Sequence, residues 1–273
     1  MAVYHNNDYM LDLCVRMAHH STAIEGNTLS QNETSSIILD DFIPRAVKER
    51  EYYEVRNYKN IIPALKYYLD MKQGINNNLI KDFNKIIMEN LLYNNGNFKN
   101  TPNLIIGATF EPTKPYLVPI ELEDLKNNLY YRIEHAENDD EKLKAILDYH
   151  IGFERIHPFS DGNGRTGRLL MIYSCLEQNI APVVIQKEQK SLYIQCLRER
   201  DIDMFFAFAK ELQQAELKRI NIFLSNELSN HIDSNDFSAL ESIKQNGLSL
   251  TDSDSKADNV SDDHNRNINK RRM

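Results

Sequence analysis

The chain has 273 residues, a formal net charge of −8, a hydrophobic content of 41% and a charged content of 26%. These values are ordinary for a globular protein of one or two domains, and the acidic balance makes nucleic acid an improbable main partner. Three widely spaced cysteines, Cys14, Cys175 and Cys196, fit neither a disulfide framework nor a zinc site and favour a reducing compartment. No secretory leader opens the chain and no apolar run reaches the ~18 residues of a membrane span, so we expect a cytoplasmic protein.

Helical periodicity of apolar residues dominates the chain up to about residue 229. The helices predicted from this periodicity cover about 8–20, 30–44, 47–68, 79–92, 120–134, 141–156, 169–176, a segment from about 189, and 204–225. Ser30 and Glu33 have the spacing of a capping box, and Pro63 is expected to kink the third helix. We therefore predict a mainly α-helical fold over residues 1–229.

The segment 103–119 differs from its surroundings. Proline residues bracket two short β-prone runs, at 104–106 and 116–118. This pattern predicts a small β-hairpin that leans on the helices, because an isolated hairpin is unstable.

Residues 230–273 are rich in Ser, Asp and Asn and poor in apolar residues, and they end on basic residues. Such a composition predicts a polar, disordered tail. Residues 239–261 faintly resemble a helix-turn-helix, but Ser253, Asp254 and Ser255 fall where that module needs apolar residues.

The stretch 157–168 reads His-Pro-Phe-Ser-Asp-Gly-Asn-Gly-Arg-Thr-Gly-Arg. Gly162 and Gly164 allow backbone N–H groups to converge on an anion, and the apolar run that follows indicates a helix whose positive dipole end faces the same anion. Arg165 and Arg168 are three residues apart and can bind phosphate oxygens. The stretch therefore predicts a phosphate-binding loop.

Two further residues give this loop a chemistry. Asp161 is a hard oxygen ligand suited to Mg²⁺, and His157 can accept a proton near neutral pH. Together they predict transfer of a phosphorus-containing group. The G-x-G-x-x-G pattern of 162–167 does not indicate a dinucleotide-binding fold, because residues 145–156 before it have the periodicity of a helix and not of a strand.

The same stretch resembles the signature of Fic domains, His-Pro-Phe-x-Asp/Glu-Gly-Asn-Gly-Arg-x-x-Arg, at every specified position. The resemblance implies a Fic-type helical bundle and an enzyme that transfers AMP from ATP to a Tyr, Thr or Ser hydroxyl of a target protein or of itself. It implies that His157 is the base and that Asp161 holds Mg²⁺. The implied ATP-binding residues are Gly162, Asn163, Gly164, Arg165, Gly167 and Arg168, with Tyr193 near the adenosine or, equally, in the core. Relatives that transfer a terminal phosphate carry Lys at the position of Gly164, so Gly164 favours nucleotidyl transfer.

The resemblance also covers the start of the chain. In Fic proteins the pattern Ser/Thr-x-x-x-Glu-Gly/Asn marks an inhibitory helix, and Ser21, Glu25 and Gly26 fit it. The implied inhibitory helix covers about 8–26, and a carboxylate of Glu25 paired with Arg168 would deprive the ATP γ-phosphate of that guanidinium. The alternative is an ordinary capped helix end with a solvated Glu25.

Fic relatives carry a flap ahead of the signature that docks an extended segment of the target. The resemblance places it at 103–119, with Leu104, Ile105, Ile106 and Gly107 as docking residues. Two other functions stay open: removal of AMP from a modified protein with the help of Glu25, and a non-catalytic nucleotide-sensing or DNA-binding regulator. Burial of Glu25 at the interface of a homodimer would be one way to control the enzyme.

Overall fold

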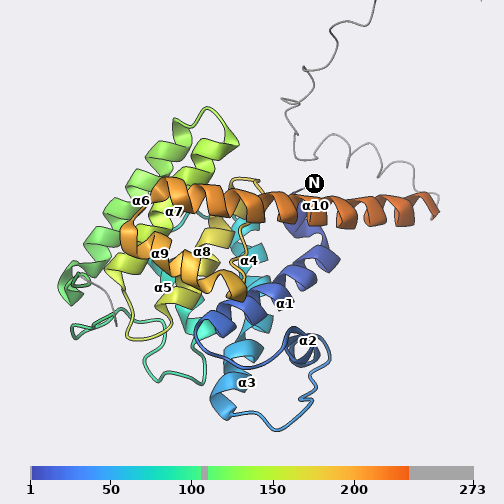
Figure 1. Ribbon diagram of the computed structural model, residues 1–273, viewed down its shortest axis with the longest axis horizontal. Coiled ribbons are helices and arrows are strands. Elements are labelled where there is room, and N and C mark those ends of the chain that lie inside the picture. The colour runs from blue at the N-terminus through green and yellow to red at the C-terminus, as the bar shows by residue number, and fades with distance from the viewer. Residues whose placement is uncertain (1, 106–109, 234–273) are drawn as a thin grey trace, which may run out of the picture.

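The computed structural model describes residues 2–105 and 110–233 and is built of helices (Figure 1). The helices are α1 Asn7–Ile24, α2 Gln31–Leu39, α3 Glu49–Arg56, α4 Ile61–Asp70, α5 Asn77–Ile87, α6 Val118–Glu134, α7 Asp139–Ile156, α8 Asn163–Glu177, α9 Lys190–Glu199 and α10 Ile202–Asp233. Short 3₁₀ turns are η1 Val3–His5, η2 Asn57–Asn60, η3 Pro115–Leu117 and η4 Lys187–Gln189. The predicted mainly α fold is confirmed.

Local sequence explains where several helices begin and end. The Ser30 hydroxyl accepts the Glu33 N–H at 3.3 Å and Glu33 accepts the Ser30 N–H at 2.8 Å, so the predicted capping box opens α2. The expected helix 47–68 is divided into α3 and α4 by η2. Pro63 has no N–H to continue the helical hydrogen bonds of the preceding turn, which accounts for the interruption just before it.

Helix α8 is the central element of the fold. Its residues from Leu169 to Leu176 are all buried, as the apolar run predicts for a helix covered on every side. Helices α5 and α7 pack against it, and α6 packs on α7. Figure 1 shows α8 inside the molecule, with α1 on one side and α6 and α7 on the other.

Helix α1 is fixed to α10 by a buried ion pair. The Arg16 guanidinium donates to both carboxylate oxygens of Glu216, at 2.7 and 2.8 Å, and Tyr9 donates to the same carboxylate at 2.8 Å. Helix α10 runs along one side of the molecule, beside the start of α1 (Figure 1). The inhibitory helix proposed from the sequence is thus part of the folded body.

No strand of the predicted β-hairpin is seen in the part of 103–119 that the structure describes, residues 103–105 and 110–119. Its second run, 116–118, lies in η3 and the first turn of α6, because Pro115 and Pro119 occupy first-turn positions where a missing N–H costs nothing. Leu104 and Ile105 lie outside any regular element, and Leu104 is exposed. Ile106 and Gly107 lie outside the described residues. The polar tail was expected from residue 230, but α10 continues to Asp233, and residues 234–273 lie outside the described residues.

A second correction concerns the helix expected over 30–44. It ends at Leu39, and Phe42 beyond it is exposed.

None of the helices over residues 2–105 and 110–233 combines the length and apolar character that crossing a bilayer requires.

Candidate functional site

The signature forms a tight loop between α7 and α8. His157 ends α7 with a left-handed backbone, φ 51°, and Gly162 precedes α8 with φ 83°. The side-chain amide of Asn163 donates to the Phe159 carbonyl and accepts the Phe159 N–H, both at 2.8 Å. Phe159 is fully buried against Phe98. The loop is therefore held rigidly by its own amide and by an aromatic anchor.

The N-terminus of α8 has the features of an anion-binding site. The N–H groups of residues 163–165 have no partner one turn earlier in the helix, and the positive end of the helix dipole lies here. A Cβ added at Gly164 would lie 2.5 Å from Oε1 of Glu25 and 3.0 Å from Nη1 of Arg168. The Glu25 carboxylate thus lies directly over the place where the sequence predicts a phosphate.

Arg168 is buried beneath this carboxylate and is held by α1. Its Nη2 donates to Glu25 Oε1 at 2.6 Å and to the Ser21 carbonyl at 2.9 Å, and its Nε donates to the Ser21 hydroxyl at 3.0 Å. The Tyr193 ring lies below, with its centroid 5.8 Å from the guanidinium carbon. Ser21 and Glu25, chosen from the sequence for an inhibitory motif, therefore both contact Arg168.

The charge state of Glu25 follows from this contact. Partial burial acts to raise the pKa of the carboxyl, but the charge and hydrogen bond of Arg168 outweigh it and the pKa is lowered. The Glu25 side chain keeps 40% of its surface exposed. The Glu25 carboxylate is therefore accessible from solvent. Gly26 follows with φ 105°, a conformation that suits glycine at the end of α1.

His157 lies on the same loop and has the features of a general base. Its Nδ1 lies 3.3 Å from the Glu154 carbonyl, which favours a proton on Nδ1 and leaves Nε2 as an acceptor. Burial lowers the pKa of the imidazole, so the ring is neutral at pH 7. A neutral imidazole with a free nitrogen can accept a proton from a hydroxyl.

Asp161 can hold a divalent cation. Its carboxylate accepts from Arg165 Nη2 at 3.2 Å and from Arg50 Nη2 at 2.9 Å, and its side chain is 39% exposed. An accessible carboxylate beside a phosphate site suits Mg²⁺, which uses few protein ligands and completes its shell with phosphate oxygens and water. No cluster of three or more His, Cys, Asp or Glu is present among the described residues, so phosphate oxygens and water would complete the shell.

Three residues predicted to bind ATP have other contacts. Arg165 is buried, with Nη1 3.3 Å from Glu54 Oε1, so its guanidinium faces carboxylates. Asn163 uses its amide to hold the loop. A Cβ at Gly167 would overlap Glu154 Oε1, so this glycine permits the close approach of α7 and α8. The three residues shape the site from beneath.

Tyr193 and His150 form part of the floor of the site. Tyr193 is fully buried in α9, and its hydroxyl lies 2.9 Å from Nε2 of His150. His150 is a buried core histidine on α7, hydrogen-bonded to Tyr193. The second reading of Tyr193, as a core residue, agrees with this burial.

Two residues of α3 belong to the site without having been predicted. Arg50 reaches Asp161, and Glu54 joins Arg50, Arg165 and the Asn27 side chain, which donates to Glu54 Oε2 at 3.0 Å. The only signal in the sequence was a spacing of four residues between opposite charges, which is common on exposed helix faces.

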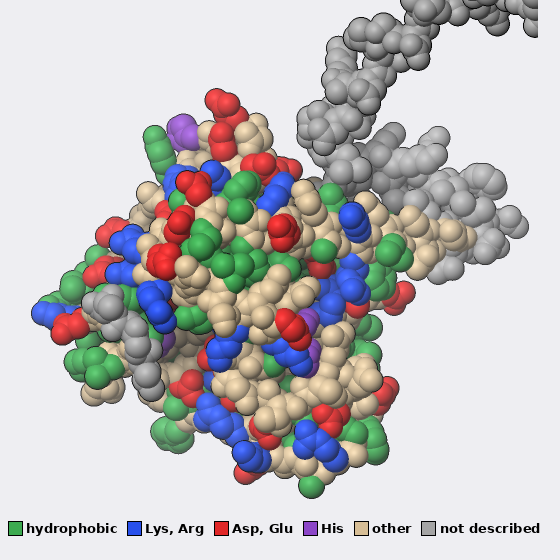
Figure 2. All heavy atoms as spheres, in the orientation of Figure 1, with side chains coloured by type: hydrophobic (Ala, Val, Ile, Leu, Met, Phe, Trp, Pro, Cys, Tyr) green, Lys and Arg blue, Asp and Glu red, His purple; other side chains and the backbone are tan. Residues whose placement is uncertain are grey.

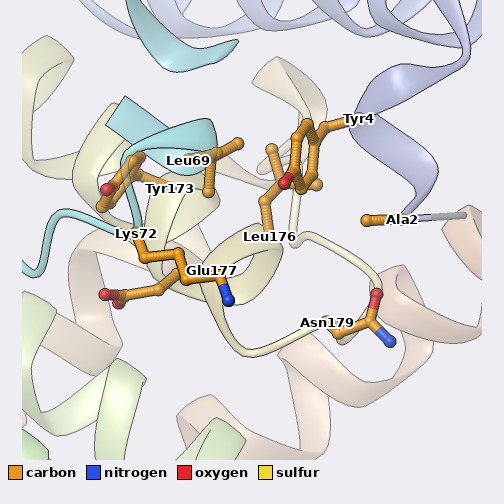
Figure 3. A pocket seen from close by; sticks show the side chains of 8 residues that line it. All are labelled: Ala2, Tyr4, Leu69, Lys72, Tyr173, Leu176, Glu177 and Asn179. Carbon is orange, nitrogen blue, oxygen red and sulfur yellow. The ribbon is translucent and has the colours of Figure 1, made fainter. Parts of the chain in front are cut away.

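A cavity of about 470 Å³ lies away from this loop, at the opposite end of α8 (Figure 3). Tyr4, Leu69 and Tyr173 form apolar walls, and Lys72 and Glu177 supply the charges. Tyr130 lies 3.0 Å from both oxygens of Glu177, yet burial raises the pKa of this carboxyl to about 7.

On the face shown in Figure 2, Lys and Arg side chains are interspersed with Asp and Glu.

Comparison with known proteins agrees with the geometry of the loop. Residues 74–175 match the model of the Fic/DOC family. Protein adenylyltransferase Fic of Culex quinquefasciatus is 29% identical over 229 residues, 80% of this chain and 43% of the relative. The protein of the same name from Drosophila grimshawi is 30% identical over 210 residues, 73% of this chain and 41% of the relative. The chain thus spans less than half the length of these curated relatives.

Solved structures share the fold. A Fic domain containing signaling protein from Bacteroides thetaiotaomicron superposes with a TM-score of 0.68 at 20% identity, over 79% of this chain and 88% of the other. A fragment of Fic-1 from C. elegans superposes with a TM-score of 0.64 at 22% identity, over 82% of this chain and 66% of the other. With the signature at 157–168 forming the loop before α8, residues 74–175 of this chain form a Fic domain of the Fic/DOC family.

Proposed function

We propose that this chain is a protein adenylyltransferase that transfers AMP from ATP to a Tyr, Thr or Ser hydroxyl of a target protein or of itself, and that Glu25 inhibits it. The observation that carries the proposal is the position of the Glu25 carboxylate, over Gly164 and 2.6 Å from Arg168. A carboxylate that rests on a helix N-terminus and pairs with a buried guanidinium occupies a site suited to phosphate. The names of the relatives support the same activity.

The residues of the loop divide the reaction among them. The acceptor hydroxyl loses its proton to Nε2 of His157 while its oxygen attacks the α-phosphorus, and the bond from that phosphorus to the bridging oxygen breaks to release pyrophosphate. The N–H groups at the start of α8 stabilise the charge that develops on the phosphoryl oxygens. Because Nδ1 of His157 is held by the Glu154 carbonyl, Nε2 is the nitrogen that accepts the proton.

Asp161 is the residue that would hold Mg²⁺, which would neutralise charge on the phosphates. Arg165 contacts the carboxylates of both Glu54 and Asp161, and it therefore fixes the Asp161 carboxylate in place. Once the Glu25 carboxylate has moved away, the Arg168 guanidinium would bind the γ-phosphate. With Glu25 in place, ATP would bind with its α-phosphate poorly aligned for attack.

The test is mass spectrometry of the intact protein after incubation with ATP and Mg²⁺. We expect Glu25→Gly to gain the mass of AMP faster than the wild type, and Glu25→Gly with His157→Ala to gain none. In a parallel assay with ATP labelled in the α-phosphate, the label must appear on the protein. Label that arrives only from the γ-phosphate would refute nucleotidyl transfer.

The 40% exposure of the Glu25 side chain also permits a second function, removal of AMP from a modified protein. There Glu25 would orient the attacking water. The same variant separates the two functions, because Glu25→Gly would then lower turnover and not raise it.

A further inference from the structure

Arg50 brings a positive charge to the signature loop from outside it. It lies in α3, before the segment 74–175 that matches the family model. Its Nη2 donates to Asp161 Oδ2 at 2.9 Å, and its Nε donates to Glu54 Oε1 at 3.0 Å. A third guanidinium therefore reaches the loop, and it contacts the carboxylate assigned to the cation.

Arg50 closes a ring of four charges. Arg165 donates to the same two carboxylates, to Glu54 at 3.3 Å and to Asp161 at 3.2 Å. Each carboxylate of the ring thus lies between two guanidiniums.

The members of this ring differ in burial. The side chains of Arg165 and Glu54 are 2% and 7% exposed, whereas those of Arg50 and Asp161 are 55% and 39% exposed. A buried pair is costly to separate, and an exposed pair contributes about 0–1 kcal/mol. The contact between Arg50 and Asp161 is the part of the ring that solvent ions can reach.

We propose that Arg50 holds the place of the divalent cation on Asp161 and competes with it, so that Arg50 must leave this carboxylate for the cation to bind. This inference rests on the proposed function for the role of Asp161. The physical reason is that Oδ2 cannot accept a charge-assisted hydrogen bond and coordinate a cation in the same direction, and that two positive charges a few ångströms apart repel. Arg50 thereby sets the cation concentration that the site requires.

The chain provides a matched control. Arg56 lies on the same helix and forms an ion pair with Asp41 at 3.7 Å, away from the loop. Arg56→Gln removes the same charge as Arg50→Gln without touching Asp161.

The test is a titration of the full chain with Mn²⁺, followed by the relaxation rate of water protons. We expect Arg50→Gln to bind Mn²⁺ about three- to fivefold more tightly than the wild type, the factor that corresponds to one exposed ion pair. Arg56→Gln should bind as the wild type does, and Asp161→Asn should lose this binding. Circular dichroism of each variant verifies that it is folded.

Two results would overturn the inference. One is equal or weaker Mn²⁺ binding by Arg50→Gln than by the wild type. The other is binding by wild type and Arg50→Gln that Asp161→Asn retains. The mass assay for AMP transfer tests the proposed function separately. If AMP is transferred but Arg50→Gln leaves the Mn²⁺ affinity unchanged, only the competition between Arg50 and the cation is refuted. If Arg50→Gln binds Mn²⁺ more tightly but no AMP is transferred, only the adenylyltransferase function is refuted.

Discussion

The hydroxyl of Ser21 accepts a hydrogen bond from Nε of Arg168 at 3.0 Å, one helical turn before Glu25 on α1. Helix α1 therefore holds this guanidinium through three hydrogen bonds, to the hydroxyl and carbonyl of Ser21 and to the carboxylate of Glu25. The Tyr58 hydroxyl donates to the same Ser21 oxygen at 3.0 Å, which fixes its orientation. Both residues hold Arg168 towards α1, so a phosphate that takes this guanidinium competes with Ser21 as well as with Glu25.

Ser21→Ala should release the inhibition in part. The variant loses one hydrogen bond to Arg168, about 1 kcal/mol, so self-labelling should rise about fivefold and stay below that of Glu25→Gly. The measurement is the initial rate of AMP incorporation. Thr22→Ala is the control, since the Thr22 hydroxyl bonds to the Ala18 carbonyl of its own helix. A rate for Ser21→Ala equal to that of the wild type would contradict a role of the Ser21 hydroxyl in the inhibition.

Arg16→Met should destabilise the protein strongly. It leaves the buried Glu216 carboxylate without its guanidinium, which typically costs about 3–5 kcal/mol of unfolding free energy. Urea unfolding followed by circular dichroism measures the loss. The double variant Arg16→Met with Glu216→Leu should recover most of it. Arg219→Met, which breaks only an exposed pair with Asp12, should change stability by less than about 1 kcal/mol.

Gly167→Ala should weaken the packing of α7 on α8. The new Cβ would overlap Glu154 Oε1 and lie 3.0 Å from a ring carbon of Phe153, so the helices must move apart at a cost of about 1–3 kcal/mol. Thermal unfolding is the measurement. Adding Glu154→Ala removes the closest contact and should restore part of the melting temperature. An undiminished melting temperature in the single variant would show that the helices are not packed this closely.

Glu177→Gln should stabilise the protein at high pH. Burial raises the pKa of the Glu177 carboxyl to about 7, so the folded protein holds a proton there that the unfolded chain has lost. The wild type therefore loses stability as the pH rises from about 4.5 to about 7, and a neutral Gln does not. The melting temperature of the variant should exceed that of the wild type by a few degrees at pH 8 and match it near pH 4. A difference that does not change with pH would contradict this assignment.

The sequence alone determined the features that depend on neighbouring residues. The capping box of Ser30 and Glu33, the buried run of α8 and the break before Pro63 follow from local rules of hydrogen bonding and burial. The twelve-residue signature indicated the loop and its chemistry for the same reason, because most of the groups that shape an anion site at a helix N-terminus are consecutive in the chain. The prediction of a strand at 116–118 from its β-prone residues was wrong, because Pro115 and Pro119 start helical turns there.

The family resemblance implied the pair of Glu25 and Arg168, but only the tertiary structure decided the other contacts of the charged groups. Arg165 and Arg168 are three residues apart on one helix, yet Arg165 turns to Glu54 and Asp161 while Arg168 turns to Ser21 and Glu25. Glu54, Ser21 and Glu25 come from α3 and α1, more than a hundred residues away, and the spacing of the two arginines carries no information about these partners. The arrangement of helices around α8 sets these long-range charge contacts, since each helix places its residues by packing that the whole chain determines.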